Sequence, residues 1–176
     1  MAGSDVKSGH LHGSGYIYKG RARVRALDVV GSSSEGTLDI WDTDVLPVAG
    51  EYVRAATTVT VTDVGHGLVT GDLIGITFLK DSNGVIATPG NYEITRVDAD
   101  TFTLTDINTG TITGDNDCYY VHSTTNGQTA RWLSSYHTNA DDIYFNGFNF
   151  PDEGLLARKG IYLRAENLVS INVYYS

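Results

Sequence analysis

Few residues in this sequence have the spacing that catalysis needs. His66 lies in a His-Gly-Leu turn just before Gly71-Asp72. A catalytic histidine would need a nucleophile and a carboxylate placed around it, and no such triad spacing is visible. We therefore expect His66 to hydrogen-bond the backbone of its own turn. The sequence also has no phosphate loop, no nucleophile elbow and no paired carboxylates in a glycosidase-like context, so it predicts a protein that is not an enzyme.

The sequence also gives little indication of a metal site or of redox chemistry. His10 and His12 form an H-x-H pair that can bind adventitious zinc, but a structural zinc site needs four ligands. The Asp and Asn residues at 115–117 and 141–142 could offer oxygen ligands to calcium, yet they follow no EF-hand pattern and are ordinary turn residues. Cys118 is the single cysteine and is expected to pack as a small apolar residue. We expect no metal, no cofactor and no disulfide.

The most pointed feature is a ladder of basic residues at every second position: Lys19, Arg21, Arg23 and Arg25. On one strand these four would share a face, where they repel each other unless acidic groups lie opposite. The acidic groups could come from a neighbouring strand of this chain or from a partner protein or sister subunit, and DNA is the least favoured partner. The four residues are interface candidates because arginine makes paired hydrogen bonds to carboxylates.

Aromatic residues form a second group of candidates. Four of them lie beside a loop or close to the end of the sequence, and each could fill the core or anchor a partner: Phe148, Phe150, Tyr174 and Tyr175. If the protein instead binds carbohydrate on a host surface, Trp41 and Trp132 are the candidates for stacking on sugars.

The elements that carry these residues are predicted to be strands throughout. Residues 16–30 alternate with period two, so that Ala22, Val24 and Ala26 would face one way and the arginines the other. Residues 37–41 predict a second short strand. Between 55 and 122, five short strands are separated by turn residues at the spacing of a small barrel or sandwich. No amphipathic helix of useful length is visible, so the fold class is all-β.

Composition divides the chain into three parts. Residues 1–15 are rich in Gly and Ser and predict a flexible N-terminal arm. Residues 55–122 are rich in Thr, Val and Asp and contain only two basic residues. We therefore interpret them as a β-barrel inserted into a β-sandwich made of 16–54 and 123–176, because insertions are tolerated at loops whose ends lie close together.

The overall charge restricts the partners. The chain has 176 residues and a formal net charge of −9, so it repels phosphate backbones and is not expected to bind nucleic acid. No apolar run is long enough to span a bilayer, and residues 1–15 lack the apolar core of a secretory signal. We expect synthesis in the cytoplasm of a host cell and no membrane association.

Two family resemblances follow from short motifs. The middle segment, through His66-Gly67-Leu68, Gly71-Asp72, Asn91-Tyr92 and the run from Asp100 to Leu104, resembles the small β-barrel module known as the first catalytic-cysteine half-domain of ubiquitin-activating enzymes. That module recurs in phage particle proteins, and the resemblance implies a fold only, since Cys118 lies outside the motif. The outer pieces, through Gly154-Leu155-Leu156 and Gly160-Ile161-Tyr162-Leu163, resemble small virion proteins of marine and freshwater tailed phages.

The second resemblance implies a component of a phage particle. The sequence therefore predicts a non-enzymatic virion structural protein that binds capsid or tail proteins, with capsid decoration slightly favoured. The alternatives are a tail or neck component and a host-surface carbohydrate-binding module. The family resemblance also implies a homo-oligomer, with a trimer favoured over a dimer.

Overall fold

The protein is all-β. The computed structural model describes residues 6–122, 124–125, 128–140, 145–151 and 153–176. The chain divides into two compact units, one made of Met1–Asp44 with Leu133–Ser176 and the other of Val45–Trp132. The first unit is called the sandwich and the second the barrel. Among the described residues, no helix has the length and hydropathy to cross a membrane.

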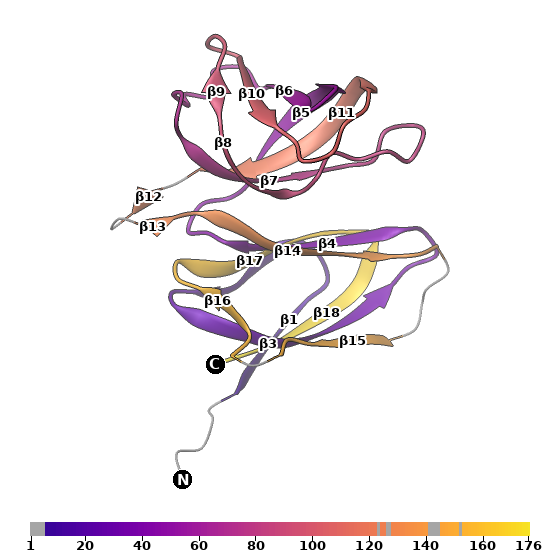
Figure 1. Cartoon of the computed structure of the whole chain (residues 1–176). Helices are drawn as coiled ribbons and strands as arrows, with labels where there is room; N and C mark the ends of the chain where they lie inside the picture. Colours follow the sequence, from indigo (N-terminus) through magenta and orange to yellow (C-terminus); the bar gives the residue numbers. More distant parts are fainter. Residues whose placement is uncertain (1–5, 123, 126–127, 141–144, 152) are drawn as a thin grey trace. The chain divides into compact units, whose positions relative to one another are not determined.

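The sandwich consists of two antiparallel sheets. One has the order β1-β18-β3-β15, with β16 also paired to β3, and the other has the order β14-β4-β17-β2 (Figure 1). Its strands are β1 (Lys7–Leu11), β2 (Gly15–Lys19), β3 (Ala22–Gly31), β4 (Gly36–Asp42), β14 (Arg131–Thr138), β15 (Phe145–Asn149), β16 (Leu155–Ala157), β17 (Gly160–Glu166) and β18 (Leu168–Tyr175). Aliphatic side chains of the inner faces form one core, including Val24, Leu27, Ile40, Leu163 and Val173.

The barrel is a seven-stranded antiparallel sheet with the order β8-β7-β11-β5-β6-β10-β9. The sheet curls until β8 lies beside β10, so the barrel is nearly closed. Its strands are β5 (Val48–Ala55), β6 (Thr58–Thr62), β7 (Leu73–Phe78), β8 (Gly90–Glu93), β9 (Thr95–Arg96), β10 (Thr101–Thr105) and β11 (Ile112–Val121). The short strands β12 (Thr124–Thr125) and β13 (Gln128–Thr129) pair only with each other.

Alternation explains how the barrel strands bury one face. In β6, Val59 and Val61 are fully buried while the threonines between and beside them face outward. In β10, Phe102 and Leu104 are buried in the same way and lie directly opposite Val61 and Val59. Because β-branched and aromatic residues suit a half-buried pleated surface, this Thr/Val/Phe pattern builds a barrel wall.

The boundary between the two units differs from the expectation of 55–122 for the inserted barrel. Strand β5 pairs with β6 and β11, so it belongs to the barrel although its residues 48–54 were expected in the sandwich. At the other end the barrel extends to Trp132. The physical reason is that a strand joins the sheet that offers it hydrogen-bonding partners, and its own composition does not reveal which sheet that is.

The expected N-terminal arm also differs. Residues 7–11 form β1, which pairs with β18 in continuous register from Lys7 opposite Tyr175 to Leu11 opposite Ile171. Ladder hydrogen bonds come from the backbone, so a Gly- and Ser-rich segment can form a strand where an open sheet edge is available. Residues 1–5 lie outside the described residues.

The segment expected as one strand over 16–30 is two strands in two different sheets. Gly20 adopts a positive φ of 128° between β2 and β3, and its N–H donates to the Lys159 carbonyl over 2.8 Å. The expected alternation holds in β3 for buried Ala22 and Val24 but not for Ala26. There, a β-bulge adds Arg25 opposite the Tyr174–Tyr175 step, so Leu27 points into the core instead.

Candidate binding surfaces

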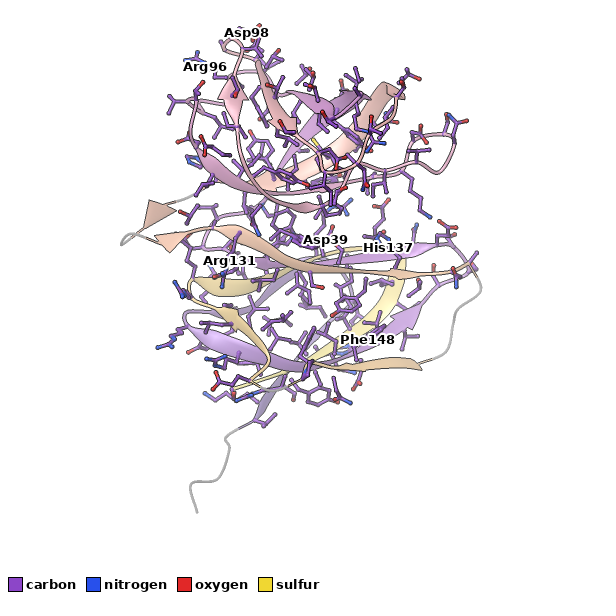
Figure 2. The ribbon with its side chains drawn as sticks, viewed as in Figure 1. Asp39, Arg96, Asp98, Arg131, His137 and Phe148 are labelled. Atoms are coloured by element: carbon purple, nitrogen blue, oxygen red, sulfur yellow. The ribbon has the colours of Figure 1, made fainter. Side chains whose placement is uncertain are left out.

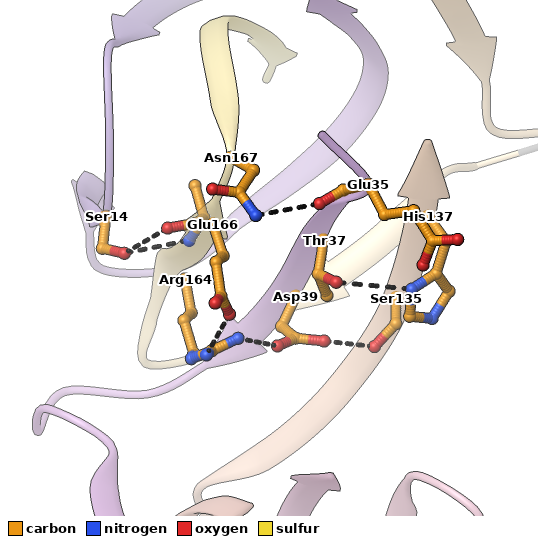
Figure 3. Close-up of polar contacts among 10 residues, drawn as sticks. Ser14, Glu35, Thr37, Asp39, Ser135, His137, Arg164, Glu166 and Asn167 are labelled. Atoms are coloured by element: carbon orange, nitrogen blue, oxygen red, sulfur yellow. Dashed lines mark hydrogen bonds and ion pairs between the residues drawn. The ribbon is translucent and has the colours of Figure 1, made fainter. Parts of the chain in front are cut away.

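A row of polar side chains crosses sheet β14-β4-β17-β2 of the sandwich. Asp39 on β4 is buried and accepts hydrogen bonds from Ser135 Oγ over 2.5 Å and from Arg164 over 3.3 Å (Figure 3). Arg164 also contacts Glu166 over 2.9 Å. His137 bonds to the Thr37 hydroxyl over 3.4 Å rather than to Ser135 (Figure 3). In a Ser-His-Asp triad the histidine lies between the serine and the carboxylate, whereas here Ser135 donates directly to Asp39 and His137 bonds to Thr37.

The other single residues that could be reactive have structural roles. The N–H of Leu68 donates to His66 Nδ1 over 3.0 Å, as expected for a turn histidine. Cys118 is fully buried, and burial raises the pKa of its thiol to about 12, which keeps it protonated at neutral pH. Asn116 donates to three backbone carbonyls of the barrel. Residues 141–142 lie outside the described residues. Within the described chain, no three metal-ligating side chains gather.

Buried carboxylates fasten the connections in both units. In the barrel, Asp106 accepts from Arg54 over 2.7 Å and from the backbone N–H groups of Thr88 and Asn108. Burial raises the pKa of Asp106, but these hydrogen bonds outweigh it and hold the pKa below its usual value. In the sandwich, Asp42 accepts from the N–H groups of Arg158 and Lys159 over 2.8 and 2.7 Å.

The turn at Gly20 between β2 and β3 divides the basic ladder between two strands. Arg23 and Arg25 lie on β3, where Arg23 pairs with Glu153 over 2.8 Å and Arg25 donates to Ser176 Oγ over 3.0 Å. The acidic neighbour in the same chain therefore exists for Arg23. Lys19 and Arg21 lie at the turn between β2 and β3 and are both exposed. Within the described part of the chain, neither of these two residues forms an ion pair.

The residue before Lys19 is an exposed tyrosine. Tyr18 is 37% exposed, and its ring centre is 5.4 Å from that of Tyr175 on β18. Lys19 Nζ lies 4.7 Å from the ring centre of Tyr16, within the range of a cation–π contact. We call Tyr18, Lys19, Arg21 and Tyr175 the turn patch. It combines two aromatic rings with two cations that form no ion pair with the residues that the structure describes, on a chain whose net charge is −9.

The remaining aromatic candidates are distributed between core and surface. Phe148 and Phe150 are partly buried against the sandwich core, with Phe148 4.6 Å from the Tyr136 ring centre (Figure 2). Tyr174 forms a hydrogen bond with Asp28 that raises the pKa of its phenol. Among the expected sugar-stacking residues, Trp41 is fully buried, and a buried ring offers no face to a sugar. Trp132 is partly exposed, and its backbone exchanges two hydrogen bonds with the Asn91 side chain.

The barrel contributes an open, acidic hollow at its surface. Glu51, Asp63 and Asp117 line it together with Ala49, Gly50, Thr62 and Val64. Tyr120 donates to Asp63 over 2.5 Å, which occupies one oxygen of that carboxylate. Arg96 and Asp98 are not among the residues that line the hollow; they lie at the turn between β9 and β10, where Arg96 Nε donates to the Asp98 carbonyl over 2.7 Å (Figure 2). The hollow therefore presents three carboxylates, one of which is hydrogen-bonded to a tyrosine.

Comparisons with known proteins add only distant structural likenesses. No protein-family model matches the sequence, and no curated protein matches it. The resemblance to the ubiquitin-activating-enzyme module thus has no family model behind it. The structure is similar to the phage phi92 endosialidase with a TM-score of 0.32 and 19% identity, over 60% of this chain and 14% of that chain. It is also similar to the reovirus attachment protein sigma1, solved with alpha-2,3-sialyllactose, with a TM-score of 0.19 and 10% identity, over 69% of this chain and 67% of that one. At such low TM-scores, neither likeness assigns a function to this chain.

Proposed function

We propose that this chain is a non-enzymatic virion protein of a tailed phage that works by binding another protein through the turn patch of its sandwich. The assignment to a phage particle rests on the sequence resemblance of the outer pieces to phage virion proteins. The observation that supports the binding mode is the pair of exposed cations Lys19 and Arg21, which have no ion-pair partner among the described residues.

The chemistry of the patch favours an acidic partner surface. Cations on a chain with a net charge of −9 are expected to be neutralised by its own carboxylates, as Arg23 is by Glu153. Arg21 is left to bind a carboxylate elsewhere, and its planar fork can do so with two hydrogen bonds. Tyr18, which precedes Lys19 in β2, and Tyr175, whose ring contacts that of Tyr18, supply apolar area of the kind found in interface anchors.

The partner is proposed to be a capsid or tail subunit, or a second copy of this chain in a homo-oligomer, with a trimer favoured by the family resemblance. The barrel between Val45 and Trp132 carries ten acidic and four basic residues, so it would suit a basic neighbour. Capsid decoration and a tail or neck role differ in which subunit the patch meets. Electron microscopy of the intact particle, with density assigned to this chain, distinguishes these locations.

The experiment that tests the patch compares matched charge variants. The double variant Lys19→Ala/Arg21→Ala removes both patch cations, and Lys80→Ala/Arg96→Ala removes the same charge from the barrel. We expect the first variant to lose incorporation into particles at least tenfold and the second to be incorporated normally, at equal circular dichroism spectra. Equal incorporation of both variants would exclude the patch as the interface.

A second candidate function is binding of an acidic glycan on a host cell. Its supporting observation is that the 37% exposed Tyr18 is followed in the chain by Lys19 and Arg21, which form no ion pair with any described residue, since aromatic rings stack on sugars and arginine binds carboxylates. An array of neutral and carboxylated glycans tests it. Binding of carboxylated glycans alone, lost in Tyr18→Ala and in Lys19→Ala/Arg21→Ala, favours this function, and no glycan binding leaves the protein interface.

A further inference from the structure

Two histidines at the N-terminal edge of the sandwich approach each other through their Nε2 atoms. His10 lies in β1 and His12 directly after it, so their spacing of two residues places both side chains on the same side of the strand. The two Nε2 atoms are 3.1 Å apart, and both side chains are exposed.

The opposite nitrogen of each ring is already held by an oxygen. His12 Nδ1 lies 3.0 Å from the Val169 carbonyl oxygen, and His10 Nδ1 lies 2.7 Å from Asn172 Oδ1. Both oxygens can only accept hydrogen bonds, so each Nδ1 carries the proton and donates it. In the neutral rings each Nε2 therefore presents a lone pair, and the two nitrogens that carry these lone pairs are 3.1 Å apart.

Two lone pairs at this distance repel each other unless a cation lies between them. The ring centres are 4.5 Å apart and the ring planes are 87° apart, so the rings converge at an angle instead of meeting head-on. Two imidazole nitrogens bound to one tetrahedral zinc ion, each about 2.0–2.1 Å from the metal, lie about 3.3 Å apart. The distance of 3.1 Å between the two Nε2 atoms is close to this value.

The surroundings match those of metal-binding histidines. Such histidines donate their second ring N–H to a carbonyl or carboxylate oxygen, which fixes the tautomer and the ring orientation. Val169 and Asn172 on β18 provide these acceptors, and Asn172 lies directly opposite His10 in the ladder. The pairing of β1 with β18 thus fixes both rings in advance of any ligand.

We propose that His10 and His12 form a bidentate site for a divalent cation that prefers imidazole ligands, of the class of zinc, nickel or copper. Among the described residues, no third side chain completes the coordination. Water, or the same histidine pair of a second copy, then fills the remaining positions. This inference is independent of the proposed role of the turn patch.

Calorimetric titration of the chelator-treated full chain with zinc chloride tests the site. We expect saturable binding that weakens at least tenfold in His10→Ala and in His12→Ala. Asn172→Ala, which removes an orienting acceptor, is expected to weaken binding about tenfold, and Asn172→Asp to preserve or strengthen it. His137→Ala removes another exposed histidine of the sandwich and is the matched control, with unchanged binding expected.

The stoichiometry and the tautomer give two further readouts. One zinc per chain supports a site completed by water, and one zinc per two chains with a doubled mass in light scattering supports a site completed by a second copy. Long-range proton–nitrogen spectra of the metal-free protein at pH 8 are expected to show His12 protonated at Nδ1. Zinc binding that is unchanged in both histidine variants, or no zinc binding by the wild-type chain, would overturn the proposal and leave a shared proton as the cation between the rings.

Discussion

The sandwich and the barrel both use a buried aspartate to fasten a long connection, but they neutralise its charge differently. In the sandwich, Asp42 is surrounded by the backbone N–H groups of the turn from Arg158 to Gly160. In the barrel, Asp106 receives two backbone N–H groups and also the guanidinium of Arg54, which is itself buried.

The difference shows which parts of each unit depend on one side chain. Backbone donors cannot be mutated away, so Asp42 is the member of these hydrogen bonds that a substitution can remove. The barrel clamp depends on two side chains, and Arg54 Nε has no hydrogen-bond partner among the described residues. Removing one side chain of the Arg54–Asp106 pair is therefore expected to lower stability more than removing Asp42, because the remaining charge stays buried without its partner.

The largest effect is expected from breaking the barrel pair. Replacing Arg54→Met leaves the Asp106 carboxylate buried without its cation and should cost about 3–5 kcal/mol in the free energy of unfolding. Urea denaturation measures the loss, and hydrogen exchange assigns it to barrel peptides. Arg96→Met, an exposed arginine of the same barrel, is the control and should change stability by less than about 0.5 kcal/mol.

The double variant Arg54→Met/Asp106→Leu sharpens this prediction. Because it removes both charges, it should recover most of the stability that the single variant loses. A double variant as unstable as Arg54→Met would show that the cost comes from lost packing and not from the uncompensated carboxylate.

A smaller effect is expected from Asp42→Ala in the sandwich. It leaves the N–H groups of Arg158 and Lys159 without their acceptor and should cost about 1–3 kcal/mol. Faster hydrogen exchange in residues 158–160, with barrel peptides unchanged, is the expected signature. Glu93→Ala removes an exposed carboxylate from the barrel and serves as control, and equal losses in both variants would contradict the role of Asp42.

Alkaline pH should act on the barrel through the phenols of buried Tyr52 and half-buried Tyr92. Burial raises the pKa of Tyr52 and of Tyr92 to about 12, whereas an unfolded tyrosine titrates at about 10. A group whose folded pKa is raised contributes stability that is fully present below the unfolded pKa, so barrel stability is intact up to about pH 10 and falls between pH 10 and 12. Tyrosinate absorbance and urea midpoints over this range measure the fall, and Tyr92→Phe should make it shallower.

The smallest effect concerns the hairpin between β5 and β6. Ala56 has a φ of 54°, which is a left-handed conformation. This conformation is strained for a residue that has a Cβ atom, and it is not strained for glycine. Ala56→Gly should therefore stabilise the barrel by about 0.5 kcal/mol, as a higher urea midpoint. A lower midpoint would mean that the added freedom of glycine in the unfolded chain outweighs the relief of strain.

The local alternation of side chains was sufficient to predict strands, but not their partners. The alternation of Thr and Val over 58–62 predicts β6 correctly, because the apolar side chains are buried and the polar ones between them are not. Arg54 sits at an inward position that its charge would assign to the surface, because its partner Asp106 lies far along the chain. The bulge at Arg25 likewise comes from the pairing with β18 and leaves no mark in the sequence of β3.

The candidate sites were predictable to the same extent. The basic ladder was visible by spacing, and its division at Gly20 was not, because a glycine in an alternating run reads equally as part of a strand. His10 and His12 were visible as a pair, but the acceptors that orient them lie on β18, more than 150 residues away. Composition does not reveal that β18 pairs with β1.

The pairing of β1 with β18 also sets an order of events during synthesis. All main strand pairs of the barrel lie between Val48 and Val121, so that unit can complete its hydrogen bonds while the ribosome is still translating the rest. The sheet that begins with Lys7 must wait for Tyr175, and loop closure over such a span is slow. The nascent chain thus carries a finished barrel and an unfinished sandwich, and the open strand edges of the sandwich at that stage are where a chaperone or a neighbouring chain would first bind.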